Sequence, residues 1–75
     1  MNFIISNRET IFGRSPKYSA KVEYNGRVFT IEITKKNCKI RNRANAVIHN
    51  VNNEYTVDED GAVKNFRDFV NFLCI

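Results

Sequence analysis

The sequence predicts an α+β domain in which an antiparallel sheet of four or five strands is covered on one face by one C-terminal amphipathic helix. Two observations carry this prediction. An Asn-Gly dipeptide lies between two runs of alternating apolar and polar residues, and the C-terminal stretch repeats apolar residues at three- and four-residue spacing. A chain of 75 residues has room for one thin core, so we expect residues 1–75 to form a single compact domain.

The first elements are short. The stretch NFIIS, residues 2–6, is expected to be an edge strand, and IFG, residues 11–13, a short extended piece. The pair Ser15-Pro16 then interrupts the chain, because proline cannot donate a hydrogen bond to a sheet ladder.

The strongest local signal is a hairpin in YSAKVEYNGRVFTIEI, residues 18–33. Asn25-Gly26 favours a two-residue type I′ turn, since both residues readily take a positive φ. That turn places Tyr24 opposite Arg27 and fixes the register of both strands. The face predicted to be apolar on both strands carries the pairs Val22 with Phe29, Ala20 with Ile31, and Tyr18 with Ile33.

Two further strand elements are predicted downstream. CKIR, residues 38–41, is expected to form a third strand after a turn at residues 35–37. NAVIHNV, residues 45–51, and EYTV, residues 54–57, are expected to pair as another hairpin around Asn52-Asn53.

The stretch TVDEDGAVKNFRDFVNFLCI predicts the helix. Thr56 and Glu59 have the spacing of a capping box, and acids at positions 58–60 complement the positive end of the helix dipole. The apolar stripe expected to face the sheet consists of Ala62, Val63, Phe66, Phe69, Val70 and Leu73. The residues expected on the opposite, polar face are Lys64, Asn65, Arg67, Asp68 and Asn71.

Charge and composition narrow the class of protein. The net charge of +4 favours an acidic partner, which could be nucleic acid or a negatively charged protein surface. No apolar run reaches the length of a membrane span, and NFIIS lacks the features of a signal peptide, so we expect a cytoplasmic protein with no membrane partner. Cys38 and Cys74 lack the spacing of a metal site. The sequence is compatible both with two reduced thiols and with a disulfide between them.

Residues for catalysis are scarce. His49 is the only histidine, no nucleophile or acid is placed beside it by the sequence, and alternation puts it on one face with Val47 and Val51. Residues 58–60 are acidic but lack the spacing of a calcium loop, and their place at a helix start explains them. The glycines are isolated and form no phosphate-binding loop. We therefore expect no enzyme activity, no cofactor and no metal.

The candidate binding site is the cluster KKNCKIRNR, residues 35–43. If residues 38–41 form a strand, two of its cations share one face and the others lie in flanking loops, so that all five could line one rim of the domain. Such a rim suits phosphates or an acidic protein surface, and a solvated sheet edge is the alternative. The five cations are Lys35, Lys36, Lys39, Arg41 and Arg43.

Phe72 is the other candidate binding residue, because it falls outside the apolar stripe of the helix. Two explanations stand side by side. Either Phe72 belongs to a protein interface, or the N-terminal strand wraps over the end of the helix and buries it.

The stretch VNNEYTVDEDGAVKNFRDF, in which a strand ending in Glu-Tyr runs into an acid-capped helix, resembles small phage-encoded anti-CRISPR proteins. The resemblance covers about 20 residues and implies inhibition of a CRISPR effector in the host cytoplasm by steric occlusion. Family members that mimic DNA are acidic, whereas this chain is basic, so an acidic protein surface or guide-RNA phosphates are the expected target.

Three classes of function follow. The leading hypothesis is a small binding protein that inhibits a larger host protein or ribonucleoprotein complex by occupying its surface. The alternative is a basic nucleic-acid-binding module that uses the same cluster, although Tyr18, Tyr24 and Phe29, the candidate stacking residues, are expected in the core. A self-associating protein is the third; the sequence leaves the oligomeric state open.

Overall fold

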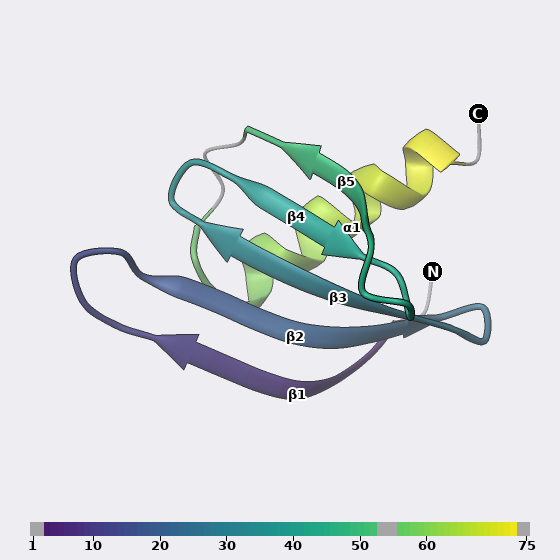
Figure 1. Ribbon diagram of the computed structural model, residues 1–75, viewed down its shortest axis with the longest axis horizontal. Coiled ribbons are helices and arrows are strands. Elements are labelled where there is room, and N and C mark those ends of the chain that lie inside the picture. The colour runs from purple at the N-terminus through teal and green to yellow at the C-terminus, as the bar shows by residue number, and fades with distance from the viewer. Residues whose placement is uncertain (1–2, 53–55, 74–75) are drawn as a thin grey trace.

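The computed structural model describes residues 3–52 and 56–73. Its elements follow in chain order as β1 (Ile4–Ile11), β2 (Lys17–Tyr24), β3 (Arg27–Thr34), β4 (Cys38–Arg41), β5 (Val47–Val51) and α1 (Glu59–Leu73). All neighbouring strands pair antiparallel in the order β1-β2-β3-β4-β5. This five-stranded sheet, with α1 lying across one face, confirms the predicted α+β class (Figure 1).

The central hairpin has the predicted register. Tyr24 lies opposite Arg27, Val22 opposite Phe29 and Tyr18 opposite Ile33. Asn25 and Gly26 take φ values of 54° and 73°, which are the positive angles that a type I′ turn requires. The turn chemistry and the apolar alternation therefore select the same pairing.

β1 is an edge strand, as predicted, but it is one continuous element rather than two short pieces. Its pairing with β2 shifts between Ser6 and Glu9, and Asn7 within the shift has a φ of 51°. Asparagine tolerates this left-handed conformation better than most residues, so the strand absorbs an irregularity and continues.

β4 matches its predicted bounds, whereas the hairpin predicted between residues 45–51 and residues 54–57 falls partly outside the described residues. Residues 47–51 form β5, which pairs with β4, and Thr56 and Val57 form no strand; residues 53–55 lie outside the described part of the chain. The short loop after β4 brings β5 back beside it as an antiparallel neighbour.

The pairing of β5 with β4 contains a bulge. Ile40 lies opposite His49 but Arg41 lies opposite Val47, so Ile48 is the extra residue. Residues that face each other across a ladder share a face of the sheet, which places Val47 with Arg41 on the helix-free face. The prediction that Val47 and His49 share a face is therefore wrong.

The core lies between α1 and the sheet. Ala62, Phe66, Phe69 and Val70 of the predicted stripe are buried, Val63 is half-buried, and the side chain of Leu73 lies outside the described structure. The buried sheet residues that they cover are Tyr18, Ala20, Val22, Phe29, Ile31, Ile33, Cys38 and Ile40. This confirms the apolar face predicted for the hairpin.

Two details of the helix differ from the predictions. Asp58 caps the helix, because its Oδ1 accepts hydrogen bonds from the backbone N–H of Gly61 at 2.9 Å and from Thr56 Oγ1 at 2.8 Å. The predicted Thr56–Glu59 capping box is thus replaced by a cap two residues later. Asn65, predicted on the polar face, is only 2% exposed and donates to the carbonyl of Gly61 at 3.0 Å, which satisfies its amide inside the core.

Candidate binding surfaces

On the helix-free face of the sheet, several cations surround one carboxylate. Glu32 accepts a hydrogen bond from Lys17 Nζ and another from Arg41 Nε, each at 2.8 Å. These two bonds lower the pKa of the Glu32 carboxyl below its ordinary value, because they stabilise the carboxylate. Lys39 lies directly opposite Glu32 in the ladder. One carboxylate therefore binds two of these cations and faces a third, so this group of four side chains keeps a net positive charge.

The structure does not bring the five predicted cations to one rim. β4 lies inside the sheet between β3 and β5, so Lys39 and Arg41 project from the middle of the helix-free face. Lys35 and Lys36 lie in the β3–β4 turn, and Arg43 lies in the β4–β5 loop at the opposite end of β4. The prediction of a common rim is wrong because it treated β4 as an edge strand.

A different cation joins Lys35 and Lys36. Arg14, in the β1–β2 loop, lines the same open hollow of about 210 Å³, together with Ser15, Pro16, Thr34 and the two lysines. In a sheet of consecutive antiparallel strands, the first and third connections emerge at the same end, and this topology is what unites distant residues. The sequence interpretation missed Arg14 because it weighed only a contiguous charge run.

Hydrogen bonds hold the β3–β4 turn. The backbone N–H of Thr34 donates to the carbonyl of Asn37 at 2.9 Å and closes the turn over the two lysines. The Asn37 side-chain amide donates to Asn50 Oδ1 at 2.6 Å and to the carbonyl of Val51 at 3.2 Å. The lysines are therefore presented from a turn that is tied to β5.

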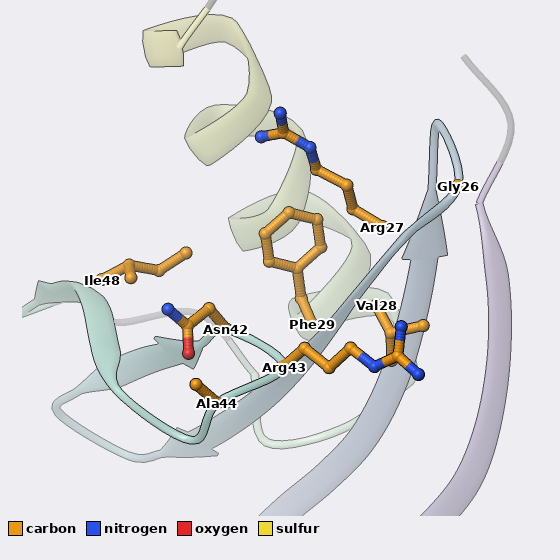
Figure 2. A pocket seen from close by; sticks show the side chains of 8 residues that line it. All are labelled: Gly26, Arg27, Val28, Phe29, Asn42, Arg43, Ala44 and Ile48. Carbon is orange, nitrogen blue, oxygen red and sulfur yellow. The ribbon is translucent and has the colours of Figure 1, made fainter.

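A second, larger hollow of about 510 Å³ opens at the other end of the sheet. Figure 2 shows the Ile48 side chain directed toward the Phe29 ring, while Arg27 reaches past that ring and Arg43 extends toward Val28. The residues that line this hollow are Gly26, Arg27, Val28, Phe29, Asn42, Arg43, Ala44 and Ile48. It combines apolar side chains with two guanidinium groups.

The β4–β5 loop that carries Arg43 is internally bonded. The side-chain Oδ1 of Asn42 accepts from the N–H of Ala46 at 3.0 Å, and the Asn42 N–H donates to the carbonyl of Ala46 at 2.9 Å. Asn45 takes a φ of 67°, and its carbonyl accepts from Arg41 Nη1 at 3.3 Å. These bonds fix the path of the loop into the β5 bulge.

Phe72 lies on the surface. Its side chain is 69% exposed, and its ring lies 6.5 Å from the ring of His49, which in turn lies 5.0 Å from Phe69. The explanation that the N-terminal strand buries Phe72 is wrong, because β1 pairs with β2 at the far edge of the sheet. We call Ile48, His49 and Phe72 the β5–α1 surface; Ile48 is 43% exposed.

Among the described residues, the side chains considered for catalysis or metal binding are packed in or against the core or hold the helix end. Partial burial lowers the pKa of His49, which packs against Phe69. Cys38 is fully buried, and burial raises the pKa of its thiol to about 12. Asp58 is the helix cap, and residues 3–52 and 56–73 contain no group of three or more His, Cys, Asp or Glu that could hold a metal ion.

Comparisons with known proteins give no relative: no family model, no curated protein and no solved structure matches the chain. The helix in the described residues is not long and apolar enough to cross a membrane.

Proposed function

We propose that this protein is a small non-enzymatic binding protein that inhibits a larger host complex by occupying its surface, and that it acts as a phage anti-CRISPR protein on a CRISPR effector. The observation that carries the proposal is the exposure of Phe72, whose ring lies 6.5 Å from that of His49, the residue that follows the exposed Ile48 in β5. Exposed aromatic and apolar side chains that lie close together, as opposed to a single exposed residue, are typical of a surface that a partner covers.

The surroundings of Phe72 define the partner. Aromatic and arginine side chains dominate the binding energy of protein interfaces, and Arg27 shares with Ile48 the hollow next to the β5–α1 surface. An apolar protein surface bordered by carboxylates complements this combination. The net charge of +4 favours the same choice and disfavours an inhibitor that mimics DNA.

The biological class rests on the resemblance of VNNEYTVDEDGAVKNFRDF to small anti-CRISPR proteins. An inhibitor that acts by occlusion must be present in at least stoichiometric amounts and turns nothing over. The half-buried His49 and the buried Cys38 are consistent with such a role, since neither is presented as a reactive group.

The test is phage plaquing on bacterial strains with active CRISPR immunity. Strains that express the wild-type protein should permit a targeted phage to form plaques, and Phe72→Ala should reduce this protection, because loss of a central aromatic costs about 2 kcal/mol of binding or more. Phe12→Ala is the matched control, since Phe12 is 85% exposed in the β1–β2 loop away from this surface.

Two outcomes would overturn the proposal. Failure of the wild-type protein to restore plaquing in any strain of a panel that covers the CRISPR types would reject the anti-CRISPR role. Equal protection by Phe72→Ala and the wild-type protein, at equal protein levels, would reject the β5–α1 surface as the docking site.

A further inference from the structure

The hollow between the β1–β2 loop and the β3–β4 turn is a second candidate site, separate from the β5–α1 surface. Arg14, Lys35 and Lys36 line it, and all three are exposed. Among the described residues, those that line this hollow include no acid. It lies at the end of β4 opposite to Arg43 and the larger hollow.

None of its three cations is bound to a carboxylate of the described residues. Lys17 and Arg41 are both bound to Glu32, whereas Arg14, Lys35 and Lys36 form no ion pair with any residue in 3–52 or 56–73. Three positive charges around one hollow repel one another, and an anion placed between them removes that repulsion. The electrostatics of the site therefore favour a ligand of more than one negative charge.

The frame around these charges is largely preformed. Pro16 is half-buried and has a restricted φ, and the Thr34 N–H donates to the carbonyl of Asn37 to close the lysine turn. The hydroxyl groups of Ser15 and Thr34 also line the hollow, and each can donate one hydrogen bond. A preorganised frame lowers the entropy that binding must overcome.

The size of the hollow restricts the ligand. Its volume of about 210 Å³ is below the range of roughly 300–1,000 Å³ that is usual for pockets that enclose a drug-sized molecule. A phosphate group is small, multiply charged and rich in acceptor oxygens, and arginine and lysine are the side chains that bind it best.

We propose that Arg14, Lys35 and Lys36 form a phosphate-binding site. The phosphate can belong to a nucleic-acid backbone or to a free phosphate or pyrophosphate ion, and both sources make the same contacts with the three cations. The site is independent of the inhibitor role proposed above, because it shares no residue with the β5–α1 surface.

The test is a titration of the ¹⁵N-labelled protein, followed by NMR, with a short single-stranded oligothymidine and separately with pyrophosphate. Amide shifts should move at residues 14, 15 and 34–36, since Pro16 has no amide proton. The variant Arg14→Gln/Lys35→Gln/Lys36→Gln should bind at least about tenfold more weakly. For three phosphate contacts on a single strand, the wild-type affinity for oligothymidine should fall with salt at a log-log slope of about 2.

The matched control is Lys21→Gln/Lys64→Gln/Arg67→Gln, which removes the same charge from exposed positions elsewhere. It should retain affinity within about threefold, since general attraction is long-ranged and screened by salt. Tighter binding of oligothymidine than of pyrophosphate assigns the site to nucleic acid, and the reverse assigns it to free phosphate. Three results would overturn the proposal: equal losses of affinity in both triple variants, amide shifts mainly at residues away from the β1–β2 loop and residues 34–36, or no binding of either ligand.

Discussion

The carbonyl oxygen of Thr56 occupies the space that a Cβ atom on Gly61 would need. Gly61 is buried in the first turn of α1, its N–H is bonded to the cap residue Asp58, and its carbonyl accepts from the side chain of Asn65. The chain entering the helix therefore passes directly against the glycine. Close approach of the backbone, and not a positive φ, requires glycine at this position.

Gly61→Ala should destabilise the protein, although alanine is intrinsically the better helix former by about 1 kcal/mol. The clash is with backbone and cannot be relieved by a side-chain rotation, so we expect a net loss of about 1–3 kcal/mol in the free energy of unfolding. Urea denaturation measures it. Asn71→Ala, at an exposed position of the same helix, should change stability by less than about 0.5 kcal/mol; a similar loss in both variants would contradict the role of Gly61.

Glu32→Gln should lower stability at neutral pH by about 1 kcal/mol, because it weakens the bonds from Lys17 and Arg41. The folded-state pKa of Glu32 is depressed, so its stabilisation is complete above the ordinary glutamate pKa and is lost as the pH falls through the folded-state value. The variant should therefore lose less stability than the wild-type protein on acidification.

Thermal unfolding between neutral and acidic pH measures this difference. Glu9→Gln is the control, since Glu9 is exposed on β1 and faces Ser19 across the ladder. A Glu9→Gln curve that parallels the wild-type curve, together with a flatter Glu32→Gln curve, supports the account. Parallel curves for all three proteins would show that the Glu32 bonds contribute nothing.

Cys38 should be chemically silent in the folded protein. It is fully buried, and burial raises its thiol pKa to about 12, which leaves almost no thiolate at neutral pH. In a Cys74→Ser background, a maleimide should label the chain only after denaturant is added. Rapid labelling of the native protein, at a rate near that of the unfolded chain, would place Cys38 at the surface and contradict the core described for β4.

His49 should titrate below its ordinary pKa, because partial burial against Phe69 disfavours the imidazolium. Asp68 opposes this shift, but desolvation is the larger cause. Neutral His49 is therefore compatible with the folded state above the ordinary histidine pKa. The protein should lose stability as the pH falls from there through the lower folded-state pKa, because the partly buried ring must then take up a proton. Following the His49 ring protons by NMR gives the pKa directly, and a value above the ordinary one would mean that Asp68 dominates.

Local chemistry made much of the fold predictable. The Asn25-Gly26 turn dictates its own register, and alternation on both sides agrees with it, so the β2–β3 hairpin could be derived residue by residue. The helix could likewise be predicted, because its apolar residues recur at helical spacing within one stretch. Each of these signals lies within one short stretch of chain.

What could not be predicted depends on contacts between stretches. The burial of Asn65 depends on the hydrogen bond that its side chain donates to the Gly61 carbonyl, and the shift of Val47 depends on a bulge against β4. Arg14 joins Lys35 and Lys36 only because two connections emerge at one end of the sheet. A reading that combined the predicted strand order with the charges of every loop would have found Arg14.

The most direct test of the central claim is photo-crosslinking from position 72. A protein with a photoreactive phenylalanine analogue in place of Phe72 is irradiated in lysate of a CRISPR-active host, with and without nuclease. We expect one nuclease-resistant adduct with an effector subunit, abolished by excess unlabelled wild-type protein but not by excess Phe72→Ala. No adduct, or the same adduct from an analogue placed at Phe12, would contradict docking through the β5–α1 surface.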